Sequence, residues 1–243
     1  MTILELQNVD KIYGTHNGKF YALKNVNLQI HEGEILIILG QSGSGKSTLM
    51  NIIAGLDRAT NGNVLFKNKD LTHYNDVELE KYRRDEIGFI FQTYNLIPNL
   101  KISENVELGA RLGHNEDAEF FMELLEEFDL LQYKDKFPYQ LSGGGKQRTA
   151  IARALAKKPN LLMGDEPTGA LDEKNAIKVM KKLQEYNRKY MTTIVVITHN
   201  PIYAKAGNRA IYINNGSITK EVVNEKITDA DELQFKDFFG GVK

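Results

Sequence analysis

The first thirty residues alternate between apolar and polar positions. Apolar side chains return at every second position in Val26, Leu28 and Ile30, and a similar alternation runs through residues 3–9. A period of two predicts β-strands. A stretch of glycine and polar residues at 14–18 predicts the loop that separates them. The chain is therefore expected to begin with strands.

Further along, short apolar runs alternate with helical patterns. The runs at 35–39, 161–163 and 193–198 have the length of buried strands. The composition of residues 46–54 suits a helix. From about Asp172, apolar residues return at helical spacing, at Ala176, Val179, Leu183 and Tyr186. Strands that alternate with helices predict an α/β fold with a parallel sheet.

A helical region interrupts this alternation. Between about residues 93 and 158, apolar side chains recur at three- and four-residue spacing, as in Phe120, Phe121, Leu124, Leu125 and Phe128. We interpret this region as a helical subdomain inserted into the α/β core. No internal repeat or low-complexity tract divides the chain further.

The composition excludes several classes of protein. With 243 residues, of which 42% are hydrophobic, the chain can bury a core without a disulfide or a metal. Its formal net charge of -1 gives no overall attraction to nucleic acid or acidic lipid, so no nucleic-acid partner is expected. The absence of cysteine rules out disulfides, thiolate zinc sites and a cysteine nucleophile, and it fits a reducing compartment.

The sequence predicts neither a membrane span nor a signal peptide. The longest wholly apolar runs lie at 35–39 and 194–197, whereas a helix that spans a bilayer needs about 20 apolar residues. Residues 1–5 lack the basic region and the long apolar core of a signal peptide. We therefore expect a cytoplasmic protein, which a partner holds wherever it works at a membrane.

The strongest chemical signal is the segment 40–47, which we call the phosphate loop. It matches G-x-x-x-x-G-K-[ST] at every fixed position and lies between a predicted strand and a predicted helix. In that setting glycines let backbone N–H groups surround phosphates, Lys46 reaches the β- and γ-phosphates, and the Ser47 hydroxyl ligates Mg²⁺. A glycine-rich turn that arose by chance is disfavoured by the flanking elements. The predicted nucleotide-binding residues are Gly40, Ser42, Gly43, Ser44, Gly45, Lys46, Ser47 and Thr48.

Two adjacent carboxylates, Asp165 and Glu166, follow the buried strand at 161–163. Neighbouring residues at a strand end point in different directions, so the two can have different roles. Asp165 is predicted to hold the Mg²⁺ shell, through water, and Glu166 to orient or deprotonate the attacking water. The alternative is a solvated acidic turn before Pro167. The phosphate loop upstream favours the catalytic interpretation.

A second glycine-rich turn opens another helix at residues 141–148. Helix N-termini bind anions, although one nucleotide rarely needs two such sites. The order L-S-G-G followed by x-x-Q-R resembles the signature of the ATP-binding-cassette (ABC) family, and residues from about 3 to 220 resemble one complete nucleotide-binding domain of that family. We call residues 141–145 the signature turn; they are Leu141, Ser142, Gly143, Gly144 and Gly145.

The resemblance implies a P-loop NTPase (RecA-like) fold. This fold has a parallel-sheet core, an N-terminal antiparallel β subdomain and the inserted helical subdomain, in a single domain at 1–220. Residues 221–243 form a tail that we predict to be helical. Its apolar residues, which fold back on the domain or contact a partner, are Leu233, Phe235, Phe238 and Phe239. The first possibility is favoured, because terminal helices often dock.

The resemblance also implies a role for the signature turn. In the family it faces the phosphate loop of a second copy, so ATP is held from both sides of a two-fold symmetric dimer. An N-cap at Ser142 is an alternative that is compatible with this role.

Other residues gain a role only through the resemblance. Tyr13 is similar to the aromatic residue that stacks on adenine, Gln92 to the glutamine that reports Mg²⁺ and γ-phosphate, and His199 to the histidine that contacts the γ-phosphate. Asp172 is similar to the aspartate that communicates across the dimer, and it also suits an N-cap. Taken alone, Tyr13 fits a core or strand-edge residue and His199 an exposed or capping histidine. The predicted catalytic residues are Glu166, His199 and Gln92, and the predicted Mg²⁺ residues are Ser47, Gln92 and Asp165.

Two positions depart from the family pattern. Gly145 stands where glutamine is usual, and glycine loosens the start of a helix by about 1 kcal/mol. A weaker contact across the dimer is therefore expected, and in the Glu166→Gln background Gly145→Gln is expected to raise the ATP-dependent dimer fraction. Gly164 stands where a larger residue is usual, which weakens the strand slightly. Neither departure removes a ligating or reacting group.

Several segments resemble one branch of the family, which includes macrolide exporters, lipoprotein-release ATPases, antimicrobial-peptide-resistance ATPases and the cell-division ATPase. These segments are residues 14–20, 55–57, 94–100, 103–106 and 165–172. ATPases of this branch pair with permeases that transmit ATP-driven bending across the bilayer. Candidates for the permease contact, or for the core of the helical subdomain itself, are Tyr94, Leu96, Ile97 and Leu100.

The resemblance thus implies a Mg²⁺-dependent ATP hydrolase that is the ATPase subunit of an ABC transporter. Two copies are expected to close on two Mg-ATP and to drive an integral-membrane permease of the export or mechanotransmission type. That permease is expected to hold the protein at the inner face of the cell membrane. Alternatives are the ATPase of a nutrient importer, a slow-turnover regulatory ATP switch, and a soluble ABC protein of translation or DNA repair. Proteins of the last kind generally carry two cassettes or a long coiled coil.

Overall fold

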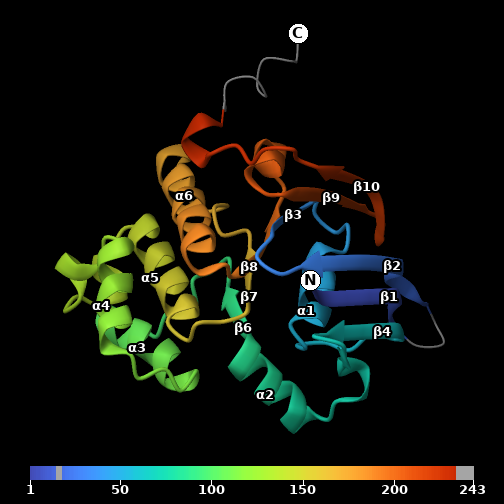
Figure 1. The fold of residues 1–243 in the computed structure, drawn as a ribbon, viewed down its shortest axis with the longest axis horizontal. Coiled ribbons are helices and arrows are strands. Elements are labelled where there is room, and N and C mark those ends of the chain that lie inside the picture. The colour runs from blue at the N-terminus through green and yellow to red at the C-terminus, as the bar shows by residue number, and fades with distance from the viewer. Residues whose placement is uncertain (15–17, 234–243) are drawn as a thin grey trace.

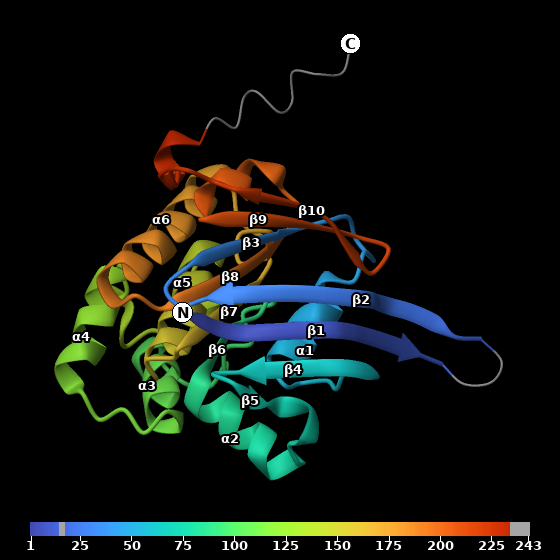
Figure 2. The ribbon, with the colours of Figure 1, turned by 45° about the vertical axis from the view of Figure 1, so that its right-hand side comes forward.

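The computed structural model of the chain describes residues 1–14 and 18–233. Two β-sheets run through this part of the molecule, and helices pack around them (Figures 1 and 2). The larger sheet has the strand order β10-β9-β3-β8-β7-β6. Its strands are β3 (Ile35–Leu39), β6 (Ile87–Ile90), β7 (Leu161–Asp165), β8 (Thr193–Thr198), β9 (Arg209–Asn214) and β10 (Ser217–Val223).

The larger sheet is mainly parallel. Strands β9, β3, β8, β7 and β6 run in one direction, and β10 returns antiparallel to β9. Every residue of β3 and β8 is buried, as expected for parallel strands that are covered on both faces. The predicted α/β fold with a parallel sheet is confirmed. Because parallel strands end at one edge, the segments that follow β3, β7 and β8 come together.

The smaller sheet is antiparallel and has the order β2-β1-β4-β5. Its strands are β1 (Thr2–Tyr13), β2 (Phe20–His31), β4 (Asn61–Phe66) and β5 (Lys69–Asp70). The last pair of the β1–β2 hairpin places Tyr13 opposite Phe20. Figure 2 shows this long hairpin extending away from helices α3 to α6. The predicted N-terminal strands are therefore present.

The helices form two groups. They are α1 (Lys46–Ile53), α2 (Asp76–Glu86), α3 (Ile102–Leu112), α4 (Ala118–Glu127), α5 (Gly143–Leu155) and α6 (Glu173–Tyr190). Helix α1 follows the phosphate loop and packs in one apolar cluster with residues of both sheets. Helices α3, α4 and α5 lie within residues 93–158 and gather at one side of the molecule (Figure 1). This grouping fits the helical subdomain, whose boundaries stay a prediction.

The core lies on both faces of the larger sheet. Successive residues of a strand point to opposite faces. Ile35 and Ile37 accordingly join a cluster formed with helices α3 to α6, whereas Leu36 and Ile38 join the cluster of α1 and the smaller sheet. Side chains thus pack on both faces of the sheet. This packing fixes the strands whose ends carry the candidate site.

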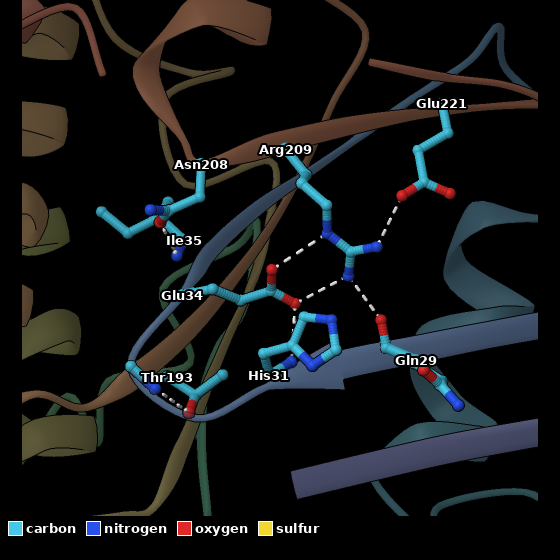
Figure 3. Close-up of polar contacts among 9 residues, drawn as sticks. Gln29, His31, Glu34, Ile35, Thr193, Asn208, Arg209 and Glu221 are labelled. Atoms are coloured by element: carbon cyan, nitrogen blue, oxygen red, sulfur yellow. Dashed lines mark hydrogen bonds and ion pairs between the residues drawn. The ribbon is translucent and has the colours of Figure 1, made fainter. Parts of the chain in front are cut away.

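A polar cluster joins the two sheets where the chain passes from β2 to β3 (Figure 3). The guanidinium of Arg209 donates to both carboxylate oxygens of Glu34 at 3.0 and 2.8 Å, to Glu221 at 2.6 Å, and to the carbonyl of Gln29. Glu34 also accepts from the backbone N–H of His31 at 2.8 Å. Both charged partners are largely buried, so breaking the pair costs about 3–5 kcal/mol. This cluster fixes the smaller sheet against the strands that carry the site.

The C-terminal tail differs from the predicted helix where it is described. The boundary at residue 220 falls inside β10, and residues 224–229 contain no helix. Residues 230–232 form one 3₁₀ turn. The buried amide of Gln184 holds it against α6, donating to the carbonyl of Thr228 and accepting from the N–H of Ala230, both at 2.9 Å. The predicted helical residues Phe235, Phe238 and Phe239 lie outside the described residues.

Candidate nucleotide site

A cavity of about 940 Å³ opens where β3, β7 and β8 end. Segments that are far apart in the sequence line it. They are residues of the phosphate loop with Thr48, the loop residue Gln92, the acidic pair Asp165 and Glu166, His199 and Pro201, and the aromatic residues Phe20 and Tyr212. The structure therefore brings the predicted phosphate loop, acidic pair, glutamine and histidine into one cavity.

The phosphate loop needs its glycines for the backbone path. Gly43 and Gly45 have φ angles of +77° and +108°, in the region that glycine adopts without strain. At Gly45, a Cβ atom would also lie 2.5 Å from the carbonyl oxygen of Ala22. No side chain caps the start of α1, so its first backbone N–H groups are available to an anion. Ser44 is buried and does not line the cavity, which leaves its backbone as its contribution.

Lys46 lies inside the phosphate loop. Its ammonium donates to the carbonyl oxygens of Gly40 at 2.8 Å and Gln41 at 2.7 Å. Burial lowers the pKa of Lys46, and the nearby carboxylates of Glu166 and Asp165 oppose this shift. Phosphate oxygens are stronger acceptors than neutral carbonyls. A bound triphosphate would therefore draw the ammonium away from the loop carbonyls and towards itself.

Oxygen donors that suit Mg²⁺ meet beside Lys46. Burial and the neighbouring Glu166 raise the pKa of Asp165, and a hydrogen bond from Ser47 opposes that rise. Hydroxyl and carboxylate oxygens are the hard ligands that Mg²⁺ prefers, with phosphate and water completing its shell. In residues 1–14 and 18–233, no group of three or more His, Cys, Asp or Glu side chains is placed to hold a metal. The Ser47 hydroxyl and the Asp165 carboxylate are in contact, and this pair of oxygen donors fits an ion that binds together with a phosphate ligand.

Glu166 has an unusual backbone that directs its carboxylate. Its φ of +48° is left-handed, and its N–H donates to the carbonyl of Ile197 at 3.0 Å. The carboxylate Oε2 lies 2.9 Å from Nδ1 of His199. A strained non-glycine backbone of this kind persists only where surrounding bonds fix it. The catalytic pair predicted at the strand ends is therefore in direct contact.

Gly164 makes room for the turn that follows it. A Cβ atom at this position would lie 3.1 Å from Cγ of Pro167. The sequence suggested only a slightly weakened strand here. The structure adds a packing reason for glycine at this position. The ring of Pro167, the residue that follows Glu166, packs against Gly164.

Helix α5 holds the loop that follows Gln92. The guanidinium of Arg153 donates to the carbonyl oxygens of Asn95 at 2.6 Å and Tyr94 at 2.9 Å. Both loop residues have left-handed φ angles, +47° for Asn95 and +62° for Tyr94. Sequence reasoning missed Arg153 because no motif marks it. Through this residue, the exposed Gln92 at the cavity is tied to the helix that begins at the signature turn.

The signature turn does not line the cavity of its own chain. Ser142 caps α5 by accepting from the N–H of Gly145 at 3.3 Å, so the N-cap interpretation is confirmed. A Cβ atom on the buried Gly145 would lie 3.0 Å from Cδ2 of Leu141. A side chain at position 145 therefore requires Leu141 of the same chain to shift by a few tenths of an ångström. The expected effect of Gly145 on a dimer stays a prediction.

Asp172 caps α6. Its carboxylate accepts from the backbone N–H of Asn175 at 2.9 Å and from the side-chain amide of Asn175 at 2.7 Å. These hydrogen bonds lower the pKa of Asp172. Its role as an N-cap is confirmed, and its role in communication across a dimer stays a prediction.

Tyr13, the predicted adenine-stacking residue, does not line the cavity, whereas Phe20 does. The Tyr13 hydroxyl donates to Asp57 at 2.6 Å. The pairing of β1 with β2 sets Phe20 opposite Tyr13. No motif points to Phe20, and only the strand register connects it with the site.

The segment from residue 23 to residue 169 matches the family model described as ABC transporter. This segment covers more than half of the chain and contains the phosphate loop, the signature turn and both carboxylates. The chain is an ABC transporter ATP-binding cassette. Members of this family hydrolyse ATP with Mg²⁺, so the predicted family and the predicted Mg²⁺-dependent ATP hydrolase are confirmed.

Two relatives match the cassette almost from end to end. The bacitracin export ATP-binding protein BceA from Halalkalibacterium halodurans is 38% identical over 98% of this chain and 94% of its own length. The ABC transporter ATP-binding protein MJ0796 from Methanocaldococcus jannaschii is 45% identical over 95% of this chain and 100% of its own length. Both support the predicted branch of the family, which is confirmed.

Solved structures share the fold of the cassette. A dimeric structure of MJ0796 in a post-hydrolysis state, bound to ADP and phosphate, matches with a TM-score of 0.82 at 43% identity and covers 90% of this chain and 98% of that chain. CbiO1 from Clostridium perfringens matches with a TM-score of 0.79 at 28% identity, over 99% of this chain and 91% of that chain. Within residues 1–14 and 18–233, none of the helices has the length and apolar character needed to cross a bilayer.

The cassette also buries an amide that lacks partners. Gln147, on α5 just after the signature turn, is 1% exposed, and neither its nitrogen nor its oxygen has a hydrogen-bond partner among the described residues. A buried unpaired amide costs about 1–3 kcal/mol. Sequence reasoning treated this residue only as part of a family pattern, because a pattern does not show which face of a helix is buried.

Proposed function

We propose that this cassette is the ATP-hydrolysing subunit of a membrane transporter, in which two copies close around two Mg-ATP and drive an export-type permease. One observation carries the proposal: a single cavity holds the phosphate loop, both carboxylates, Gln92 and His199.

The phosphate loop is the proposed triphosphate site. The backbone N–H groups at the start of α1 and the ammonium of Lys46 bind the phosphates, because a helix N-terminus and a cation both favour negative charge. Lys46 exchanges the carbonyl oxygens of Gly40 and Gln41 for phosphate oxygens. The burial that lowers the pKa of Lys46 also strengthens its attraction to phosphate, because less water screens the charges.

Ser47, Asp165 and Gln92 would hold Mg²⁺ beside the phosphates. When bound, the ion neutralises charge that develops on the phosphate oxygens as the bond to the γ-phosphorus breaks.

Glu166 is the proposed base. It orients a water molecule in line with the γ-phosphate and accepts its proton. The hydrogen bond from the backbone N–H of Glu166 to the carbonyl oxygen of Ile197 fixes the direction of the carboxylate. His199, in contact with that carboxylate and 62% exposed at the cavity, is proposed to contact the γ-phosphate. A positioned base of this kind contributes about 10²- to 10⁴-fold to the rate.

A second copy is proposed to complete each site. The signature turn does not line the cavity of its own chain, and the relative MJ0796 is a dimer in its structure with ADP and phosphate. The signature glycines leave the start of α5 without side chains. Another molecule can therefore approach its backbone closely.

A second cavity, of about 520 Å³, is the proposed docking site of the permease. We call it the permease groove. Its apolar lining includes Phe89, Phe91, Leu108 and Leu112, and its charged lining is Arg83, Arg84, Arg153 and Lys157 with Glu80. The excess of positive charge favours a cytoplasmic permease segment that carries apolar and acidic side chains. Arg153 also holds the loop after Gln92, so nucleotide state and permease contact are linked through one residue. Docking here would hold the cassette at the inner face of the membrane.

Export is the proposed direction. The relative named for bacitracin export is 38% identical over nearly the whole chain. The proposed cargo is therefore of the antimicrobial-peptide class, handled by the permease and not by the cassette.

The variant Glu166→Gln tests the proposed function. Phosphate release from ATP should fall about 10²- to 10⁴-fold, because the neutral amide cannot accept the proton. ATP binding should persist, and an ATP-dependent dimer should accumulate in light scattering. The control is Glu119→Gln, which neutralises an exposed acid on α4 and should leave turnover unchanged. Rapid hydrolysis by Glu166→Gln would remove Glu166 from the role of base.

A further inference from the structure

A 3₁₀ helix at Pro201–Ala206 follows His199 closely. His199 lies between Thr198, the last residue of the buried strand β8, and Asn200. Asn200 donates its N–H to the hydroxyl of Thr198 and caps the 3₁₀ helix by accepting from the N–H of Ile202, both at 3.1 Å. The imidazole of His199 is 62% exposed, so packing gives it little orientation. Its position therefore depends on the strand and the 3₁₀ helix that hold its backbone.

The end of this 3₁₀ helix is held from outside. Hydrogen bonds of 3₁₀ type have poor geometry, and the last carbonyl groups of a helix have no partner within it. Four consecutive carbonyl oxygens, at residues 204–207, here accept from other segments. Their donors are the side-chain amide of Asn224, twice at 2.8 Å, the N–H of Thr228 at 2.9 Å and the side-chain amide of Gln184 at 2.9 Å.

Residues 224–230, which we call the strap, are themselves fixed at both ends. The N–H of Asn224 donates to the carbonyl of Asn208 at 2.8 Å, and Asn208 is hydrogen-bonded to Ile35 at the start of β3 (Figure 3). At the other end, two hydrogen bonds of 2.9 Å join the strap to the amide of Gln184, which is 1% exposed on α6. The strap thus runs from the larger sheet to α6 and holds the 3₁₀ helix between them.

We propose that the strap positions His199 for hydrolysis, with Asn224 and Gln184 as the positioning residues. Neither residue lines the nucleotide cavity, so both act through the 3₁₀ helix and not on the ligand. The inference rests on the proposed function, because it assumes that His199 contacts the γ-phosphate. A loosened 3₁₀ helix lets the imidazole leave the position that hydrolysis needs, and a displacement of about 1 Å at a reacting centre costs about 100-fold in rate. The strap should therefore affect turnover and leave ATP binding unchanged.

The experiment measures the effect of Asn224→Leu on turnover with and without His199. Leucine has a shape similar to that of asparagine and lacks both donors to the 3₁₀ helix. In the wild type, Asn224→Leu should lower kcat about tenfold, a part of the cost of full misplacement, and leave KM and ATP affinity within about twofold. His199→Ala should itself lower kcat about 100-fold, as for loss of one preorganised donor. In that background Asn224→Leu should change kcat by less than about twofold, because the two substitutions remove the same contact.

Further variants separate positioning from general stability. Glu225→Leu places the same side chain on the next, exposed residue of the strap and should match the wild type. Gln184→Met removes the donor to Ala206 and should show the same dependence on His199. Asn224→Ser leaves room for water at the freed carbonyls, so it gives the same comparison with a smaller loss if the other variants do not fold.

Phosphate release at saturating ATP and titration with ATP decide between the outcomes. Wild-type kcat in Asn224→Leu would overturn the inference. Equal losses with and without His199 would also overturn it, because the strap would then support the whole domain and not the histidine. A loss of ATP affinity at unchanged kcat would place the effect of the strap on binding, against the inference. Unchanged turnover in His199→Ala would instead contradict the role of His199 in the proposed function, and the inference would fall with it.

Discussion

Two helices of this cassette begin with glycine-rich turns; the phosphate loop lines the nucleotide cavity, and the signature turn does not. At the phosphate loop, Gly43 and Gly45 are left-handed and no side chain caps α1. At the signature turn, the glycines are absent from the residues with positive φ, and the hydroxyl of Ser142 caps α5. The first turn thus has no side-chain cap, whereas in the second the N–H of Gly145 is already bound by Ser142 of the same chain.

The glycines of the two turns serve different physical needs. A side chain at Gly45 would be strained and would meet the backbone of Ala22 at 2.5 Å. Added Cβ atoms in the signature turn would meet side chains, 3.2 Å from the Tyr94 hydroxyl at Gly143 and 3.0 Å from Asn175 at Gly144. The phosphate loop therefore needs glycine for its own backbone, whereas the signature turn uses glycine to leave room for neighbouring side chains.

The acidic groups mark the same difference. Asp165 and Glu166 line the cavity of the phosphate loop, and the signature turn does not reach that cavity. In one copy, both carboxylates thus share a cavity with the phosphate loop, whereas the signature turn lies outside that cavity. This difference supports the proposal that the two turns act on one nucleotide when they come from different copies.

The largest expected effect tests this division between copies. Lys46→Ala removes the ammonium from the phosphate loop, and Ser142→Arg blocks the signature turn. Each should lower ATP turnover at least about 100-fold, as for loss of one preorganised donor. An equal mixture should recover turnover at least tenfold above either variant, because mixed dimers contain one site with an intact loop and an intact signature. Phosphate release from the mixture measures this.

The control for the mixture leaves no intact shared site. Lys46→Ala is mixed with the double variant Lys46→Ala/Ser142→Arg, and no recovery is expected. Turnover of the first mixture at the mean of its two components would show that each copy works alone.

A smaller effect compares one glycine from each turn. Gly45→Ala should weaken ATP binding by single copies about tenfold or more, because its left-handed backbone strains any other residue by about 1–2 kcal/mol. Gly143→Ala lies in a helix, where alanine is favoured by up to about 1 kcal/mol. It should leave ATP binding by single copies unchanged and lower only the ATP-dependent dimer fraction. Titration at low protein concentration and light scattering at high concentration separate the two effects. Equal losses of ATP binding would contradict the distinction.

The sequence predicted those parts of the site that depend on local order. The phosphate loop and Glu166 each follow a short buried strand, and that order is visible along the chain. Parallel strands then bring the two segments together. The roles of Gln92 and His199 came only from the family resemblance, although the cavity holds both.

Residues that depend on distant contacts could not be predicted. Phe20 reaches the cavity through the register of β1 with β2 and through the approach of Ala22 to Gly45. Arg153 matters because a loop 58 residues away offers it a carbonyl oxygen. Gly145 was interpreted as facing a partner, whereas a side chain there first meets Leu141. In each case the sequence pattern predicted the helix or strand, but it did not predict which residues of that element contact a neighbouring segment.

The smallest effect concerns the far end of the signature helix. Lys157, which follows α5, donates to the carbonyl oxygens of Arg83 at 2.7 Å and Arg84 at 3.0 Å, in the last turn of α2. Burial lowers the pKa of Lys157 to about 8, whereas an unfolded lysine has a pKa of about 10.4. Below pH 8 both states are protonated, and the folded state bears the full cost of burying the charge. Between about pH 8 and 10.4 only the unfolded state keeps the proton, so the folded state gains relative stability as the pH rises.

Lys157→Met removes this titration and should flatten the pH dependence. From pH 7 to pH 9.5, the free energy of unfolding of the wild type should rise by about 1–2 kcal/mol more than that of the variant, a value reduced for partial solvent screening. Urea unfolding of both proteins at the two pH values measures the difference. The other titrating groups occur in both proteins, so their contributions cancel in the comparison. ATP affinity of single copies should be equal in the two proteins, because the phosphate loop lies outside this contact. If the free energies of unfolding of the two proteins changed equally with pH, Lys157 would stay charged in the folded state. A loss of ATP affinity would show that the two turns are coupled within one copy, against the division between copies.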